Sequence, residues 1–322
     1  MWKGMTALAV GAWLLATSPG GTLAQAYRVK PVRVLVGFSP GGGVDFMARS
    51  VSPRLAQALG QPFVIDNRSG ANGMIAADIA AKSPADGYTL LMAPGNYAFA
   101  SALEKLPLDM KTAFSGVAQL VDSPLLVVVH PSLPVKNLRS LIALARAQPN
   151  GLAYGSGGIG GAGHMATELF KSMAQVSLLH VPFKGVGPAL TDAIAGHVPV
   201  CFCTLPTTLP QARAGRLRAL AVTTANRTSA AADIPTVAES GVPGYEMSQW
   251  YGVLSSAGTP AAILGRLSGE INKALLLPEL RASLVAAGAD PVTSSPQAFD
   301  RFFSQEIEKW TRIVKVAGIR AQ

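Results

Sequence analysis

The chain has 322 residues, of which 49% are hydrophobic and 14% charged, and its formal net charge is +9. This length exceeds what one hydrophobic core usually holds, so two domains are expected. The basic residues are scattered, and the densest groups, at 28–30 and 213–218, contain no interleaved aromatic side chains. A nucleic-acid interface needs a basic stripe with stacking residues, so nucleic acid is not an expected partner.

The first 26 residues have the composition of a Sec-type signal peptide. Lys3 supplies a positive start, residues 7–16 are apolar but too short to span a bilayer, and Ala24 and Ala26 are the small residues that signal peptidase reads. Cleavage is predicted after Ala26, which leaves a mature net charge of 26 − 18 = +8. No later apolar run reaches membrane-spanning length, so an exported soluble protein is expected. An uncleaved N-terminal anchor is the alternative.

The two cysteines, Cys201 and Cys203, stand two apart in a predicted strand. Alternation places both side chains on one face about 6–7 Å apart, so a bridge would need a backbone distortion. Two small, buried, unbridged side chains are therefore expected. The four histidines are widely spaced and fit no metal-ligand motif, so no metal is predicted.

Short β-branched runs alternate with helical patterns along the first third of the chain. The predicted strands are 32–38, 63–66 and 88–92, and the predicted helices are 44–59 and 71–82. This order favours a parallel sheet with right-handed crossovers. Pro53 lies inside the first helix and is expected to kink it.

A second α/β series follows, and a helical segment ends the chain. The predicted strands of this series are 125–130, 152–154, 177–181, 198–203 and 218–222, and its predicted helices are 138–147, 162–174 and 188–195. Apolar residues from Phe303 to Ala317 recur at helical spacing, so this helix must pack on a sheet. If it returns to the first unit, the chain crosses between two lobes near residues 123–131 and 244–258. Two crossings make a hinge, and a ligand can be enclosed between the lobes.

Each unit contains a glycine-rich loop between a strand and a helix. The first loop consists of Phe38, Ser39, Pro40, Gly41, Gly42 and Gly43 and leads to Asp45; the second contains Ser156, Gly157, Gly158, Gly160 and His164. Glycine lets backbone amides approach a ligand, and the helix start adds partial positive charge, so a carboxylate or phosphate fits either loop. Asp45 either caps its helix or contacts ligand. A plain tight turn is the alternative for the first loop.

Nucleotide cofactors are not predicted. Gly155, Gly157 and Gly160 match G-x-G-x-x-G, but the next strand does not end in the acidic residue that a dinucleotide fold requires. No Gly-Lys-Ser/Thr follows either loop, which argues against a P-loop.

Hydrolase chemistry has little support. Tyr154 stands where a G-x-S-x-G elbow needs glycine. A triad of Ser156, His164 and Asp192 can be drawn, so an exported α/β hydrolase stays as an alternative, although His164 is expected to cap or pack at its helix start. Lys184 follows a predicted strand and is either an anion ligand or a solvated side chain.

Ordered blocks along nearly the whole mature chain carry a family resemblance. They include Lys30-Pro31-Val32-Arg33, Pro40-Gly41-Gly42, Leu59-Gly60-Gln61-Pro62, Asp86-Gly87-Tyr88-Thr89-Leu90, Tyr154-Gly155-Ser156 and His180-Val181-Pro182-Phe183-Lys184-Gly185. In these blocks the sequence resembles the substrate receptors of tripartite tricarboxylate transporters, the Bug (Bordetella uptake gene) family. The resemblance implies a periplasmic type II binding protein, with two α/β lobes joined by two crossover strands in a Venus-flytrap arrangement.

The resemblance also implies a function and its residues. It implies a monomeric, non-enzymatic periplasmic receptor, without cofactor, that binds a small carboxylate (a di- or tricarboxylate, amino acid or aromatic acid) and delivers it to membrane permease subunits. The lobes would be residues 27–124 with 251–322, and residues 125–250. The two glycine loops would hold the carboxylates, and the further candidates are Asn96, Phe183, Lys184, Gly185, Asp192 and Thr204. A sensory binding module without a permease is another alternative.

Three departures from the family pattern affect the ligand, and one of them is the unusual Cys201-Phe202-Cys203 strand next to the expected cleft. Gly161 stands where the family often has threonine, and Phe183 replaces the usual tyrosine. The Gly161 and Phe183 departures each remove a hydroxyl group. Each of the three departures would shift the preference toward a bulkier or less polar acid.

Overall fold

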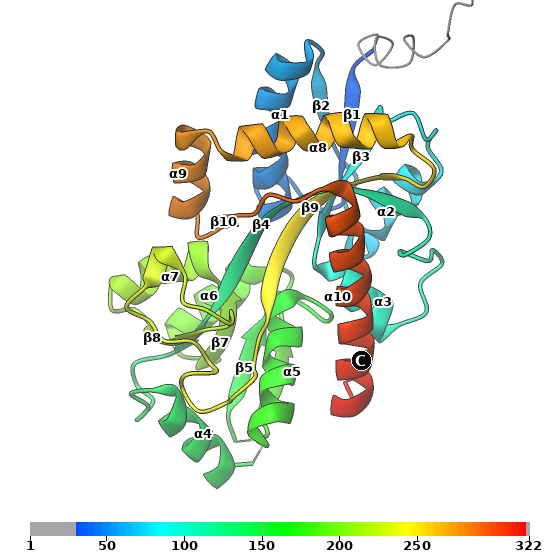
Figure 1. Ribbon diagram of the computed structural model, residues 1–322. Helices are drawn as coiled ribbons and strands as arrows, with labels where there is room; N and C mark the ends of the chain where they lie inside the picture. The colour runs from blue at the N-terminus through cyan, green and yellow to red at the C-terminus, as the bar shows by residue number, and fades with distance from the viewer. Residues whose placement is uncertain (1–29, 150, 320–322) are drawn as a thin grey trace, which may run out of the picture.

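The computed structural model describes residues 30–149 and 151–319 (Figure 1). The predicted signal peptide and its cleavage site lie outside the described residues. Every helix in the described part of the chain is too short or too polar to cross a membrane.

The first third of the chain folds as a parallel α/β unit, as predicted. Its elements are β1 (Val32–Val36), α1 (Gly43–Leu59), β2 (Phe63–Asn67), the 3₁₀ turn η2 (Ala71–Gly73), α2 (Met74–Ala81), β3 (Thr89–Pro94) and α3 (Asn96–Leu103). Strand β1 pairs in parallel with β2 and β3, and its apolar run is buried because helices cover a parallel sheet. Helix α1 contains Pro53 and ends at Gly60, whose left-handed backbone (φ 68°) lets its amide bond to Ala56.

The middle of the chain begins with the long strand β4 (Phe114–Val129). The predicted strand at 125–130 is only its second part, because Gln119 and Asp122 interrupt the apolar pattern of the first part. The following elements are α4 (Leu138–Ala147), β5 (Ala153–Ser156), α5 (Ala162–Ala174), β6 (Leu179–Pro182), α6 (Val186–Ala195), β7 (Val200–Thr204), α7 (Leu205–Arg213), β8 (Arg218–Val222) and the 3₁₀ turn η3 (Ser229–Ala231).

The last part of the chain returns to the first unit. Its elements are β9 (Ser248–Ser256), α8 (Ala261–Leu275), α9 (Pro278–Ala286), β10 (Asp290–Pro291) and α10 (Pro296–Ala317). Helix α10 is the predicted amphipathic C-terminal helix. Its aromatic side chains pack against Trp250 of β9 and Phe99 of α3, which fixes it on the first unit.

All ten strands belong to one mixed sheet with the order β2-β1-β3-β9-β4-β7-β5-β6, while β10 and β8 also pair with β4. Figure 1 shows two halves: the β1 half (β1–β3, α1–α3 and α8–α10) and the β5 half (β5–β8 and α4–α7). Strand β4 belongs to both, because its first part pairs with β9 and its second part with β7 and β8. The chain therefore leaves the β1 half along β4 and returns along its antiparallel neighbour β9.

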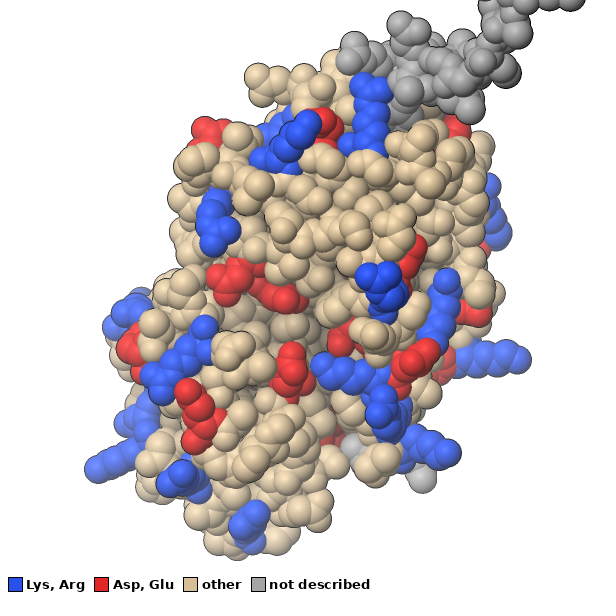
Figure 2. Space-filling model, viewed as in Figure 1, with Lys and Arg blue, Asp and Glu red and all other residues tan. Residues whose placement is uncertain are grey.

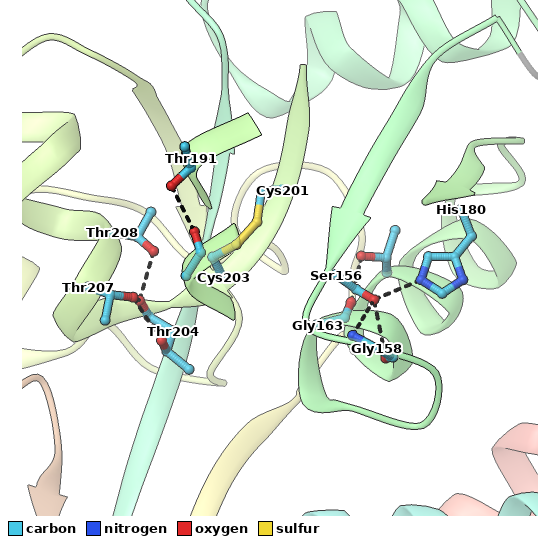
Figure 3. The surroundings of a disulfide bond; sticks show 12 residues. Ser156, Gly158, Gly163, His180, Thr191, Cys201, Cys203, Thr204, Thr207 and Thr208 are labelled. Carbon is cyan, nitrogen blue, oxygen red and sulfur yellow. Dashed lines mark hydrogen bonds between the residues drawn. A yellow bond between two sulfur atoms is a disulfide. The ribbon is translucent and has the colours of Figure 1, made fainter. Parts of the chain in front are cut away.

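The expectation for the cysteines was wrong. Cys201 and Cys203 form a disulfide within β7 (Figure 3). Their Cα atoms are 5.6 Å apart, closer than the expected spacing and within the range that a disulfide spans. Both side chains are buried, as expected, against apolar residues of α6 and α7.

Candidate functional site

The carboxyl ends of the parallel strands place the candidate loops. Strands β1, β2 and β3 end at one edge of the β1 half, and β5, β6 and β7 end at one edge of the β5 half. Loops at the carboxyl ends of such strands are where α/β folds bind ligands. The β1–α1 loop (residues 37–42) and the β5–α5 loop (residues 157–161) both start from these ends.

The Asp45 side chain stabilises the β1–α1 loop by hydrogen bonds. Its carboxylate accepts hydrogen bonds from the Gly41 amide (2.9 Å), Arg49 Nε (2.8 Å) and Asn67 Nδ2 (3.1 Å). Asn67 also donates to the Phe38 carbonyl (3.1 Å), so both ends of the loop are tied to β2. Arg49, together with the Gly41 and Asn67 bonds, holds the pKa of Asp45 below its ordinary value although burial opposes this. Asp45 is thus a buried support of the loop.

The exposed part of this loop carries the amides. Ser39, Pro40, Gly41, Gly42 and Gly43 are exposed, and Phe38 is half-buried. Gly41 has a φ of 82°, which favours glycine. Helix α1 begins after Gly42 without a side-chain cap, so its first amides remain available to an anion.

The β5–α5 loop is joined to the β6–α6 loop (residues 183–185) by backbone bonds. The Phe183 amide donates to the Ser156 carbonyl (3.0 Å), and the Gly185 amide donates to the Gly157 carbonyl (3.1 Å). A Cβ on Gly157 would lie 3.0 Å from the Val186 nitrogen, so glycine is needed for this approach. The two loops therefore form one surface, and α5 also begins without a side-chain cap.

The buried side chain of Ser156 stabilises the β5–α5 loop (Figure 3). The side chain is fully buried, and its Oγ lies 2.7 Å from His180 Nε2 and 3.2 Å from both the nitrogen and the oxygen of Gly158. His164 is also buried, and its Nδ1 accepts the Gly160 amide (3.2 Å). The side chains of both predicted ligand residues thus hold the loop through its Gly158 and Gly160 amides, and every loop residue except Gly160 is at least partly exposed.

The β5–α5 loop approaches η2 and α3 of the β1 half. A Cβ on Gly160 would lie 3.2 Å from Leu103 Cδ1 and 3.7 Å from Asn72 Nδ2, both on the β1 half. Asn96 links Asn72 (3.5 Å) to Gln249 of β9 (3.2 Å). A chain of side-chain amides therefore runs from the crossing strand to the point where the two halves meet.

The structure also places Asn96, Thr204, Lys184 and Asp192. Asn96 and Thr204 were expected on post-strand loops, but Asn96 is the first residue of α3 and Thr204 is the last residue of β7. Lys184 is exposed on the β6–α6 loop. Asp192 lies six residues into α6, about 9 Å along the axis from the start of the helix at Val186, and faces His197 (3.7 Å).

The proposed hydrolase triad does not assemble. Ser156 contacts His180, while His164 binds the Gly160 amide and Asp192 faces His197. A nucleophile must also reach its substrate, and the Ser156 side chain is fully buried. Among the described residues no cluster of three or more His, Cys, Asp or Glu side chains is arranged to hold a metal.

Comparison with known proteins decides the family. Residues 47–319 match the model of the tripartite tricarboxylate transporter family receptor. The chain belongs to this receptor family. The family assignment and the α/β binding-protein fold expected from the sequence are both confirmed.

Relatives of this receptor span about nine tenths of its length. BugT of Bordetella pertussis is 35% identical over 300 residues, which cover 92% of each chain. The structure of R. palustris Rpa4515 with adipate is 40% identical, covers 91% of this chain and 99% of its own, and superposes with a TM-score of 0.83. MatC from Rhodopseudomonas palustris with bound malate is 30% identical and superposes with a TM-score of 0.79. The match covers 89% of this chain and 99% of the MatC chain. These similar receptors are binding proteins, and two of them hold carboxylates.

Sequence reasoning missed several residues of the candidate site. His180 and Asn67 lie in family-matching regions but were not singled out, because nothing in their local pattern shows which loop atoms they contact. Asn72 gave no signal, since its left-handed backbone (φ 50°) becomes visible only in the fold. Gln249 belongs to the crossing strand, which the sequence did not define.

Proposed function

We propose that this chain is a periplasmic receptor that captures a small carboxylic acid between two lobes and delivers it to a tripartite membrane transporter. The observation that carries the proposal is the approach of the β5–α5 loop to the β1 half: a Cβ on Gly160 would lie 3.7 Å from Asn72 Nδ2 of η2. The turn η2 in turn packs against the start of the β1–α1 loop, because a Cβ on Gly37 would meet Gly73 Cα. Each loop precedes a helix that begins without a side-chain cap. Two such loops suit a ligand with carboxylates at both ends, such as a dicarboxylate.

The lobes would be residues 27–124 with 251–322, and residues 125–250, and β4 and β9 would form the hinge. A closed lobe pair contacts both ends of the ligand, whereas an open pair contacts one, so the ligand favours closure. The ligand-contacting residues would be those predicted for the two loops, with Phe183 and Gly185 beside them. Binding would rest on backbone amides, with no covalent step.

A thermal-shift screen with mono-, di- and tricarboxylates, amino acids and aromatic acids tests this function. Adipate and malate are the first probes, because similar receptors hold them. A ligand at about 100 times its Kd should stabilise the protein by about 2.7 kcal/mol. Stabilisation by a neutral sugar, with none by any acid, contradicts the proposal.

A substitution in the loop localises the binding. Gly42 has an extended backbone, and a Cβ there would meet only the Ser39 carbonyl at 3.4 Å, so Gly42→Leu should fold and block the approach of a carboxylate. Gly187→Leu, on the exposed surface of α6, is the matched control. A ligand-induced shift that persists in Gly42→Leu would place binding elsewhere.

Delivery to a permease and export are tested in cells. Deletion of the chain should abolish uptake of the radiolabelled acid that it binds, whereas a sensory module would leave uptake intact. N-terminal sequencing of the protein from the periplasmic fraction should begin at Tyr27.

A further inference from the structure

Two histidines lie directly under the β5–α5 loop. His180 of β6 is stacked between Tyr154 of β5 (ring centroids 4.8 Å apart) and His164 of α5 (4.3 Å). Through Ser156 Oγ, His180 reaches the backbone of Gly158, and His164 directly holds the amide of Gly160. The two neighbouring rings therefore hold Gly158 and Gly160 of the β5–α5 loop, one through Ser156 and the other directly.

The hydrogen bonds at Ser156 determine which nitrogen of His180 carries the proton. A hydroxyl oxygen donates one hydrogen bond and accepts two. The Gly158 amide donates to Ser156 Oγ, so the three contacts are satisfied together when His180 Nε2–H also donates to Oγ and the hydroxyl donates to the Gly158 carbonyl. His180 Nδ1 is buried and has no hydrogen-bond partner among the described residues. A buried N–H group without an acceptor would be costly, so this nitrogen carries the lone pair and not the proton.

His164 must carry its proton on the same nitrogen. Its Nδ1 accepts the Gly160 amide, so the proton of the neutral ring lies on Nε2. Protonation of Nδ1 would replace this acceptor with a donor that faces another donor, which would break the bond to the loop.

Burial favours the neutral form of both rings and outweighs the opposing charge of Glu168. The ionisable groups around them are Tyr154, Glu168 and Lys171, with Glu168 bonded to Tyr154 Oη (2.6 Å) and to Lys171 (2.7 Å). Burial lowers the pKa of His180 to about 4, and the neighbouring His164 and Lys171 add to this effect. Burial also lowers the pKa of His164.

We propose that His164 and His180 are the positioning residues of the ligand site: as neutral rings protonated on Nε2, they hold residues 156–160 in the conformation that brings the loop to Asn72 and Leu103 of the β1 half. This rests on the proposed function, because the loop is the second-lobe half of the carboxylate site. Neither ring touches the ligand; each acts through the loop backbone.

Conservative substitutions separate positioning from packing. Glutamine places its amide N–H where His180 has Nε2–H, and asparagine places its carbonyl oxygen where His164 has Nδ1. His180→Gln and His164→Asn should bind adipate within threefold of the wild type at pH 7.5, while His180→Leu and His164→Leu should bind at least tenfold more weakly. Equal affinity in the leucine and conservative variants overturns the proposal.

A measurement on the wild-type protein without ligand keeps the test independent of adipate binding and of variant folding. Nitrogen NMR of labelled histidine should show both rings neutral and protonated on Nε2 at pH 6. The amide resonances of Gly158 and Gly160 should move in the leucine variants and stay in the conservative ones. A proton on Nδ1 of either ring overturns the proposal, whereas failure to bind any acid with the expected NMR result would refute only the ligand assignment.

Discussion

The Asp45 carboxylate accepts the Gly41 amide at 2.9 Å, so a side chain in the first turn of α1 fixes the left-handed residue of the preceding loop. Asp45→Ala removes this bond and those from Arg49 and Asn67. We expect a loss of about 2 kcal/mol in the free energy of unfolding at pH 7, together with weaker acid binding. Urea denaturation and calorimetry measure the two effects.

The effect of Asp45 should depend on pH. Its pKa is lowered in the folded protein, so its contribution is present above the unfolded pKa, near 4, and is lost as pH falls through the folded pKa. The stability difference between the wild type and Asp45→Asn should therefore shrink below pH 4. Asp78→Ala, which breaks the exposed pair with Lys82, is the control and should change stability by about 0.5 kcal/mol or less.

Gly157→Ala should separate the two loops of the β5 half. The new Cβ would lie 3.0 Å from the Val186 nitrogen and 3.2 Å from the Gly185 carbon, so the β6–α6 loop must shift and lose its bond to the Gly157 carbonyl. We expect at least a tenfold loss of acid affinity in calorimetry. Gly187→Ala has open space around its Cβ in exposed α6 and should keep the affinity while adding about 0.5 kcal/mol of stability.

Glu306 anchors the C-terminal helix. Its buried carboxylate accepts from the indoles of Trp250 (3.3 Å) and Trp310 (3.2 Å), which ties α10 to β9. Glu306→Ala should cost about 3 kcal/mol in chemical denaturation, because both buried N–H groups lose their acceptor. Glu308→Ala removes only an exposed pair with Lys111 and should cost about 0.5 kcal/mol. Similar costs for both would contradict the assigned role.

Asp122 should limit stability at neutral pH. Burial raises its pKa to about 6, and the charges of Glu306, Glu246 and Asp290 act in the same direction. Since the folded protein holds this proton more tightly than the unfolded chain, the stabilising contribution is full below pH 4 and is lost as pH rises through 6. Asp122→Asn should thus raise the free energy of unfolding at pH 7.5 by roughly 1–2 kcal/mol, and the Tm with it. At pH 4 the substitution should leave both unchanged. An equal gain at both values would refute this origin.

The disulfide of β7 closes a very short loop. Reduction should therefore lower the free energy of unfolding by only about 1–2 kcal/mol. The double variant Cys201→Ala/Cys203→Ala should show no response to reductant. Labelling of both thiols by iodoacetamide in unfolded, unreduced protein would show that the bridge is absent.

Local patterns predicted most of the first unit, because its strands are apolar and its helices amphipathic. The sequence also located both glycine loops, since strand, glycines and helix are contiguous. It could not show that Ser156 turns inward to His180, because their contact depends on the parallel pairing of β5 with β6. The first part of β4 was missed for a similar reason: Gln119 and Asp122 are polar, but tertiary contacts bury or half-bury them.

The pairing of Pro124 with Ser248 has an evolutionary consequence. The segment between these two residues begins and ends at neighbouring positions of the sheet. Two junctions are therefore enough to replace it with the same segment of another receptor. Recombination there would replace the β5–α5 and β6–α6 loops as one cassette and leave the β1–α1 loop untouched. Under the proposed function, such an exchange would alter one side of the ligand site and leave the other side as it was.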